Sequence, residues 1–534
     1  MPSDPIGALD EGLLSPVTVG ADAEVSDAAI LAALIEVEVA LTRAWATVGT
    51  APDAVAVAVA DSLAVAGGIT LARIVAASVA GGNPVIPLVG ALKERVPLET
   101  RAWVHRGATS QDILDSALML VSQRAGASVQ TALRETEQRL AVFAATHRDV
   151  AAAARTLTQH AVPTTVGARA AGWLRGVRRA RIRLDETLAA LPAQLGGAGG
   201  TLAAFVEIGG ADAAAALPAA FAGELGLAVP DAPWHVQRWP VTELGDALVQ
   251  AIDALGKLAT DVATLSRTEI GELAEGAGGG SSAMPQKQNP AASVLIRSAA
   301  LRAPQLAATL HLAAALAADE RPDGAWHAEW PTLRELLRLA LGASATGVSL
   351  VAGLRVDAEA TARNLAVTGG LVVAERLSLA LTALLGSDEV ARIVRDAGRG
   401  GDLRALVAVA LEAAVDRAPG ATHPADGVDD LLDPAHYTGL AGELVDGAVR
   451  AAATTPPDPA DAAPVDDSGV LWRSYADEPA ATHPDEPAGA PGSDAPTRGL
   501  PGRGLPAPGA SGSGAPAPST DVSPGSAAEA ESAQ

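Results

Sequence analysis

Residues 240–265 read PVTELGDALVQAIDALGKLATDVATL, and this stretch decides the fold class. Its large apolar residues recur at steps of three and four over about six turns, which places them on one face of a helix. They are Leu244, Leu248, Ile252, Leu255, Leu258, Val262 and Leu265. The acidic residues between them fall mainly on other faces. The pattern predicts a long helix packed in a bundle.

The same periodicity recurs at residues 27–48, 117–143, 168–190, 294–317 and 333–354. Aromatic residues make up only 2% of the chain, whereas small and aliphatic residues dominate it. Helix bundles accommodate this mixture better than sandwiches or barrels, whose strands favour aromatic and β-branched residues. We therefore expect an all-α fold with a central bundle of long helices.

With 534 residues, the chain exceeds the size at which one hydrophobic core stops growing, so several domains are expected. We expect an N-terminal helical domain at residues 1–105, a central long-helix domain at 106–350 and a C-terminal helical domain at 351–450. Residues 451–534 are rich in Pro, Ala, Gly and Ser and carry an excess of acidic residues. Such a composition buries too little apolar surface to offset its ordering entropy, so we expect a disordered tail.

Net charge and cysteine content exclude several classes of partner. The formal net charge of −24 argues against nucleic acid, because binding a phosphate backbone requires clustered Lys and Arg. The chain has no Cys, which removes disulfides and thiolate metal sites and is consistent with a reducing cytoplasm. The first twelve residues lack the apolar core of a secretory signal, and no uninterrupted apolar run is long enough to span a membrane. We expect a soluble cytoplasmic protein without a membrane partner.

Three polar segments punctuated by Gly or Pro separate the expected helices, at residues 105–115, 155–167 and 278–290. The third contains GSSAMPQKQNP at residues 280–290, with glycines before it, two stiffening prolines, two hydroxyls, an ammonium and an amide. Such a loop can close over a bound anion and stabilise negative charge that develops on a carboxylate. The alternative is a flexible linker with an incidental lysine.

Residues 280–290 resemble the signature loop GSSxMPxKxNP of the fumarase/aspartase superfamily, and every fixed position of that pattern is present. The resemblance implies that Ser282 is a catalytic acid or base. It also implies that Lys287 and Asn289 hold a substrate carboxylate, with Ser281 and Met284 contributing through backbone placement and packing.

In the first segment, Thr109 and Asp112 are spaced as in a capping box, which marks a helix start with free N–H groups that would suit a carboxylate. A simple helix cap is the alternative. The segment also resembles the superfamily's HxGATSQD motif, whose polar residues bind substrate carboxylates. The matching positions are His105, Thr109, Ser110 and Gln111.

Residues 155–167 resemble the GRTHxQxAxPxTxG region of the superfamily, with one departure. Leu157 stands where fumarases carry His, and a histidine follows three residues later as His160. Muconate cycloisomerases share that arrangement, so the chain is most similar to that branch. The resemblance makes His160 a catalytic candidate and Thr158 and Gln159 substrate contacts. A buried His160 satisfied by a backbone carbonyl is the alternative.

The resemblance implies a three-domain subunit that assembles into a homotetramer with a twenty-helix core and active sites shared between subunits. The implied reaction is lactonisation of the tricarboxylate 3-carboxy-cis,cis-muconate to 4-carboxymuconolactone in protocatechuate breakdown, without a cofactor. No residue cluster has metal-ligand spacing, so no metal is expected. Another superfamily lyase, such as adenylosuccinate lyase, and a non-catalytic helical scaffold are the alternatives. Which of Ser282, His160 and His105 is acid and which is base stays open.

Overall fold

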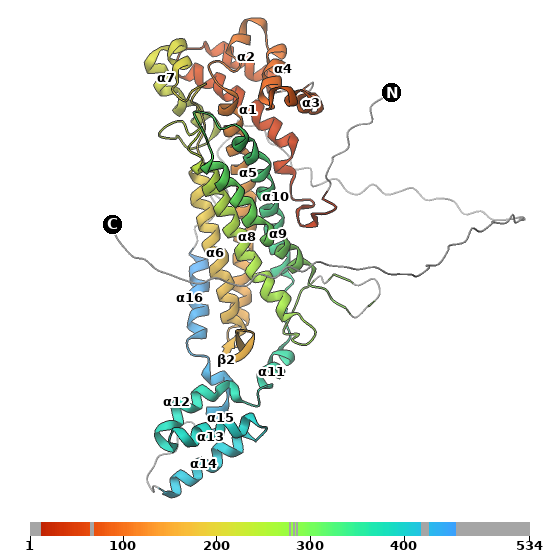
Figure 1. The fold of residues 1–534 in the computed structure, drawn as a ribbon, viewed down its shortest axis with the longest axis vertical. Helices are drawn as coiled ribbons and strands as arrows, with labels where there is room; N and C mark the ends of the chain where they lie inside the picture. The colour runs from red at the N-terminus through yellow and green to blue at the C-terminus, as the bar shows by residue number, and fades with distance from the viewer. Residues whose placement is uncertain are drawn as a thin grey trace, which may run out of the picture. The chain divides into compact units, whose positions relative to one another are not determined.

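The computed structural model describes residues 12–64, 69–276, 279–280, 284, 287–417 and 427–454 (Figure 1). Ser281 and Ser282 lie outside the described residues, as does nearly all of the expected tail. The chain divides into a unit at residues 1–458, which is described below, and a unit at residues 459–534, which lies outside the described residues.

Five long helices form a bundle at the centre of the first unit (Figure 1). They are α5 (Ser110–Thr146), α6 (Val166–Ala189), α8 (Trp239–Leu265), α9 (Ala291–Ala315) and α10 (Gly324–Ala352). Helix α8 is the one predicted from residues 240–265, and the prediction of an all-α fold is confirmed. Helix α8 packs against α6, α9 and α10, and α5 packs against α6 and α10.

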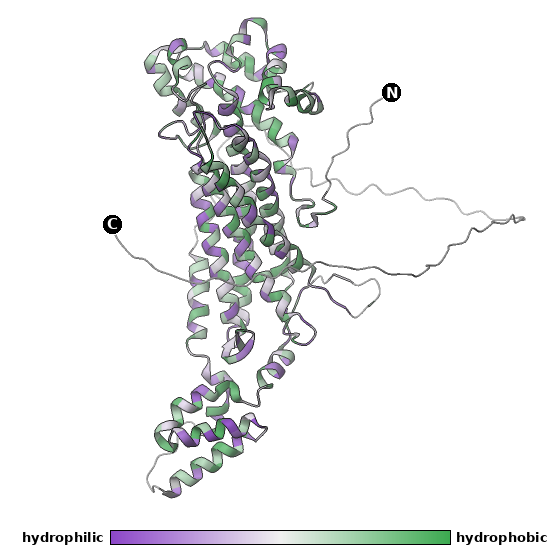
Figure 2. Cartoon of the chain, viewed as in Figure 1, coloured by the Kyte–Doolittle hydropathy of each residue, from purple (hydrophilic) through white to green (hydrophobic). Residues whose placement is uncertain are grey.

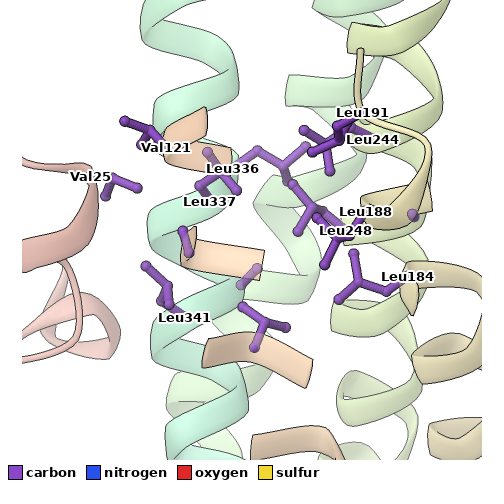
Figure 3. Close-up of a cluster of buried hydrophobic side chains, with 14 of the residues drawn as sticks. Val25, Val121, Leu184, Leu188, Leu191, Leu244, Leu248, Leu336, Leu337 and Leu341 are labelled. Atoms are coloured by element: carbon purple, nitrogen blue, oxygen red, sulfur yellow. The ribbon is translucent and has the colours of Figure 1, made fainter. Parts of the chain in front are cut away.

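The core of the bundle is built from the periodic leucines. Leu244 and Leu248 of α8 point toward Leu188 of α6 and Leu336 of α10 (Figure 3), and all four are at most 5% exposed. Burying each leucine contributes about 1.5–3 kcal/mol relative to leaving it in water. Gly245 lets α9 approach closely, because a Cβ there would lie 2.7 Å from Leu310 Cδ1. Figure 2 shows hydrophilic and hydrophobic residues interleaved along these helices, as amphipathic packing requires.

A second group of helices packs around the start of α5 (Figure 1). These are α1 (Asp27–Thr47), α2 (Asp53–Ala64), α3 (Leu71–Gly81), α4 (Val85–Arg95) and α7 (Ala203–Leu225). Helix α7 is interrupted at Gly210, whose φ of 81° departs from helical geometry. This group therefore surrounds the segment that the sequence assigned to carboxylate binding.

By length and composition, α7 and α10 are apolar enough to cross a membrane. In α10, 61% of the apolar window is buried within the protein, and the same helix carries Glu329, which is paired with Arg238. The apolar face of α10 is thus used in the bundle core.

Short 3-10 helices at Pro16–Thr18, Ala23–Val25 and Leu98–Trp103 accompany these two groups, and the remaining strands and α-helices follow toward the other end of α5. The strands are β1 (Ala151–Thr156), β2 (Gln159–Thr165), β3 (Leu273–Ala274) and β4 (Arg355–Val356). The helices are α11 (Ala358–Ala366), α12 (Ala374–Leu385), α13 (Ser387–Gly398), α14 (Leu403–Arg417), α15 (Val428–Leu432) and α16 (Ala441–Ala453). Helices α12 to α15 share a small core of their own. Helix α16 instead packs on α5 and α6, where Arg148 Nε donates to Asp446 Oδ1 at 2.9 Å.

Candidate active site

The start of α5 has the capping box that the sequence predicts. Thr109 is the N-cap residue, and its N–H donates to Asp112 Oδ2 at 2.9 Å. Just before it, His105 has a positive φ of 60° and its Nδ1 lies 2.7 Å from Glu38 Oε1. Glu38 is 1% exposed, so a buried carboxylate of α1 orients the His105 ring. The resulting arrangement presents free helix N–H groups and a fixed imidazole at one end of the bundle.

Asp112 does more than cap α5, because its buried carboxylate organises a second loop. Asp112 Oδ1 accepts from Gly196 N at 2.8 Å and lies 2.8 Å from His235 Nε2, while Oδ2 accepts from Gly197 N at 3.0 Å. The loop at residues 194–202 is therefore fixed against the start of α5. Ser116 Oγ of the same helix holds the start of the loop as well, because it accepts from Gln194 N at 2.9 Å and donates to the Gln194 carbonyl at 3.0 Å.

Arg321 adds a cation to this end of the bundle. One of its Nη2 hydrogens is donated to Thr109 Oγ1, and Nη2 also lies 3.1 Å from the carbonyl oxygen of Ala198. Because Arg321 contacts both the N-cap residue and the 194–202 loop, it places a cation at the surface beside the start of α5. Arg321 was not among the residues selected from the sequence.

A buried ionic network lies beneath this surface. The guanidinium of Arg238 binds Asp115 Oδ2 at 2.7 Å and Glu329 Oε2 at 2.6 Å. Trp326 Nε1 donates to Asp115 Oδ1 at 2.8 Å, so this tryptophan, 3% exposed, has a packing and anchoring role. Burial raises the pKa of Glu329, and the charge of Asp115 adds to that effect against the opposing pull of Arg238.

Gln111, a predicted substrate contact, is fully buried. Its Nε2 donates to the carbonyl oxygen of His235 at 2.9 Å and to Asp115 Oδ2 at 3.2 Å. Its Oε1 is buried without a partner among the described residues. The side chain thus supports the network, whereas Thr109 and Ser110 stand at the helix end itself.

The second candidate segment forms the β1–β2 hairpin. Its two-residue turn places Leu157 at φ 48° and Thr158 at φ 70°, and Leu157 is 96% exposed. Turns of this kind favour Asn and Gly, so a leucine at the tip stores backbone strain. Gln159 follows directly and is also exposed, so the three tip residues face away from the bundle of their own chain.

His160 sits opposite Arg155 in the hairpin and borders a cavity of about 520 Å³ that Thr368 and Gly398 also line. Its Nδ1 is buried without a hydrogen-bond partner among the described residues, so the expected alternative of a backbone carbonyl partner does not apply to that atom. Burial and then the charge of Arg155 lower its pKa, against the opposing effect of Glu272. The neutral imidazole, which can accept a proton, is therefore favoured at pH 7.

Arg155 links the hairpin to the segment that leads into the signature loop. Its Nη2 lies 2.5 Å from Glu272 Oε1, and Asn364 Nδ2 donates to the same oxygen at 2.9 Å. Burial alone would raise the pKa of Glu272, but the hydrogen bonds and charges of these partners hold it below its ordinary value. The hairpin and the loop therefore lie at the same end of the bundle.

The signature loop is closed at its base by two backbone hydrogen bonds. Gly279 N donates to the Asn289 carbonyl at 2.9 Å, and Asn289 N donates to the Gly279 carbonyl at 3.0 Å. Met284 and Lys287 are exposed, and Lys287 N donates to the Met284 carbonyl at 3.0 Å. Lys287 is thus accessible to solvent at this end of the bundle.

The predicted site residues fall into two sets at opposite ends of α5. This helix contains 37 residues, and at 1.5 Å per residue it is about 55 Å long. His105, Thr109, Ser110 and Gln111 lie at its start, whereas the hairpin with His160 follows its end and pairs with the stem of the signature loop. One chain therefore brings His160 and Lys287 to the same end and keeps both far from Thr109.

Comparison with known proteins identifies the family of this chain. A family model described as lyase matches residues 21–304 of the chain. The chain belongs to the fumarase/aspartase superfamily of lyases.

The chain is 48% identical over 453 residues to nitrosuccinate lyase of Streptomyces davaonensis, a match that covers 83% of this chain and 95% of that protein. It is 42% identical over 438 residues to 3-carboxy-cis,cis-muconate cycloisomerase of Pseudomonas aeruginosa, covering 79% and 92%. The solved structure of the 3-carboxy-cis,cis-muconate lactonizing enzyme from Pseudomonas putida matches with a TM-score of 0.72 at 35% identity, covering 80% of this chain and 95% of that one. The resemblance to the superfamily and to its cycloisomerase members is thereby confirmed.

Sequence reasoning about the lyase missed Glu38, His235, Arg238 and Arg321. Their partners lie far away along the chain, at separations from 67 residues for Glu38 and His105 to 212 residues for Arg321 and Thr109. One signal was present, because Arg321 lies beside Pro322 in a short polar segment between the helices expected at 294–317 and 333–354. Within the described part of the lyase, no group of three or more His, Cys, Asp or Glu side chains could hold a metal ion.

Proposed function

We propose that this lyase works as a homotetramer whose active sites combine the two ends of the bundle from different subunits. The observation that supports this is the separation by α5 of two complementary half-sites, each with groups suited to carboxylates or proton transfer. Thr109 and Arg321 form one half, and His160 and Lys287 belong to the other. An antiparallel arrangement of neighbouring bundles would bring the start of one α5 to the end of another.

Within such a site, we propose an addition or elimination at a carbon next to a carboxylate. Thr109, Ser110 and Arg321 would bind one carboxylate, and Lys287 and Asn289 a second. Ser282 or His160 would move the proton, a function that typically contributes ~10²–10⁴ in rate. The formal oxidation of one carbon is balanced by the reduction of its neighbour in either reaction, so there is no net redox change and no redox cofactor enters the proposal.

The first candidate reaction is lactonisation of 3-carboxy-cis,cis-muconate. One substrate carboxylate oxygen bonds to a carbon of a double bond while a proton is added at the neighbouring carbon. The candidate is supported by the Leu157 and His160 arrangement and by the 42% identity to the Pseudomonas aeruginosa cycloisomerase. The three carboxylates of this substrate suit a site with cations from both half-sites.

The second candidate is elimination of nitrite from nitrosuccinate, favoured by the 48% identity to the Streptomyces davaonensis lyase. A base removes a proton from the carbon next to one carboxylate, the C–N bond breaks, and fumarate and nitrite leave. A nitro group is planar with two oxygens and thus resembles a carboxylate in shape. The same anion-binding groups would therefore serve either substrate.

A direct assay separates the candidates. Purified protein is mixed with 3-carboxy-cis,cis-muconate and, separately, with nitrosuccinate, and the loss of diene absorbance and the release of nitrite are followed. Faster turnover of muconate supports the cycloisomerase, and faster release of nitrite supports the second candidate. Failure of both substrates with a folded tetramer would contradict the proposed function, and a stable monomer would contradict the shared site.

A further inference from the structure

The incoming stem of the signature loop is fastened to the end of α10. Strand β3 pairs with β4, and Arg355 Nη2 donates to the Glu275 carbonyl at 3.2 Å. Immediately afterwards Gly276 crosses Gly353 so closely that a Cβ on Gly276 would lie 2.6 Å from the Gly353 Cα. The backbone of the incoming stem is therefore fixed in place up to Gly276.

The outgoing stem is the start of α9, and it lacks a cap of its own. The N-cap residue is Pro290, which makes no side-chain capping hydrogen bond. The cap comes instead from Glu275, whose Oε1 accepts from Ser293 N at 2.9 Å and whose Oε2 accepts from Ala292 N at 3.1 Å. Glu275 is 7% exposed, so this carboxylate is shielded from water while it faces the positive end of the helix.

Glu275 therefore joins the two stems. Its backbone belongs to the incoming stem, and its carboxylate holds the outgoing stem, 17 and 18 residues further along the chain. Lys287 and Asn289 lie between these two attachments. The Gly279–Asn289 backbone pair also joins the stems at the base of the loop. Glu275 adds a side-chain connection that a local N-cap, which would satisfy the same α9 amides, would not provide.

We propose that Glu275 is a positioning residue that sets where the signature loop presents Lys287 and Asn289 to substrate. The proposal rests on the proposed function only for the identity of the substrate. With both carboxylate oxygens engaged, Glu275 holds Ala292 and Ser293 of the outgoing stem against the incoming stem, in addition to the Gly279–Asn289 pair. Loss of one attachment lets the outgoing stem shift, and a displacement of 1 Å at a reacting group typically costs about 10² in rate.

The test compares Glu275→Gln with Glu269→Gln. Glu269 is an exposed glutamate between α8 and β3, so its variant controls for a lost charge in the same region. Glutamine at position 275 keeps one acceptor oxygen but turns an NH2 group toward the second α9 amide. Turnover is measured on the tetramer, and the reactivity of the Lys287 amine toward an acylating reagent is measured by mass spectrometry. Lys93 on α4 is the internal reference.

We expect Glu275→Gln to lower kcat by about tenfold or more. We also expect it to change the ratio of Lys287 to Lys93 acylation by about threefold or more, because a shifted outgoing stem changes the surroundings of the Lys287 amine. Glu269→Gln should leave both readouts at wild-type values. A purely structural cap would lower thermal stability and leave the acylation ratio of the folded tetramer unchanged, and that result would overturn the proposal.

A second variant covers the case in which Glu275→Gln does not fold. Glu275→Asp keeps the charge but shortens the reach by one methylene, and the same two readouts decide, with a wild-type acylation ratio again overturning the proposal. If wild-type protein turns over neither candidate substrate, the proposed function fails. The acylation ratio alone then decides the role of Glu275, so the two failures are distinguishable.

Discussion

Asp112→Asn is the substitution for which the structure allows the fullest reasoning. Asp112 is fully buried and its two oxygens face four groups: the N–H groups of Thr109, Gly196 and Gly197, and the imidazole of His235. Asparagine retains one oxygen for two of these groups and presents NH2 to the other two. Two hydrogen bonds to a charged group are therefore lost.

Each lost bond to a charged group is worth about 1.5–3 kcal/mol, and removing one partner of a buried charged set typically costs about 3–5 kcal/mol. For the unit of 458 residues, an unfolding entropy of about 2.1 cal/mol/K per residue gives roughly 1 kcal/mol/K. We therefore expect Tm to fall by about 3–5 °C. Turnover should fall by about tenfold to a hundredfold, because the N-cap of α5 and the 194–202 loop both lose their anchor.

Scanning calorimetry at a fixed protein concentration measures the Tm change, since dissociation of an oligomer is coupled to its unfolding. Asp212→Asn is the matched control, because Asp212 is exposed on α7. A Tm within about 1 °C of wild type together with unchanged turnover would refute the anchoring role of Asp112.

Three further predictions concern the opposite end of the bundle. Ser282→Ala and His160→Asn should each lower turnover by ~10²-fold or more while the tetramer persists. Mixing the two variants and allowing subunits to exchange should restore part of the activity, and failure to recover activity after proven exchange would count against shared sites. Wild-type turnover in either variant would remove that residue from the mechanism. Burial and the charge of Arg155 lower the pKa of His160 below 6.5, so its neutral form persists to lower pH than that of an ordinary histidine. The acidic limb of the kcat/KM profile should therefore have its midpoint below pH 6.5 and should flatten in His160→Asn. A midpoint above pH 6.5, or an unchanged limb in the variant, would show that another group titrates. Replacing Leu157 and Thr158 together by Asn and Gly should relieve the backbone strain of the turn and raise the free energy of unfolding by about 1 kcal/mol. Turnover should fall if the hairpin tip contacts substrate in a neighbouring subunit. A lower free energy of unfolding in denaturant would contradict the inferred strain.

Much of the fold follows from local patterns. The leucine steps at residues 240–265 locate α8, and the spacing of Thr109 and Asp112 locates the start of α5. Both signals depend on residues within one or two turns of each other, which is why they can be interpreted without knowing the partner. The β1–β2 hairpin was not predicted, because its first strand consists largely of alanine, a strong helix former. Strand pairing across the turn overrides that propensity.

For the candidate site, too, local motifs identify the residues but not the distances between them. The motifs in the sequence identified His105, Thr109, His160, Lys287 and Asn289, because the superfamily pattern is written in short contiguous segments. They did not show that the length of α5 separates His105 and Thr109 from His160, Lys287 and Asn289. Distance between segments depends on helix length and packing direction, which only the folded chain reveals.

The helical class, the family pattern and the chemical types of the site residues can be predicted from the sequence, since each depends on neighbouring residues. The contacts of Glu38 with His105, of Arg321 with Thr109 and of Glu275 with the start of α9 appear only in the folded chain. These side chains are unremarkable in sequence. Their roles come from partners between 17 and 212 residues away, and a charged side chain acquires such a role only when folding buries it beside its counterpart.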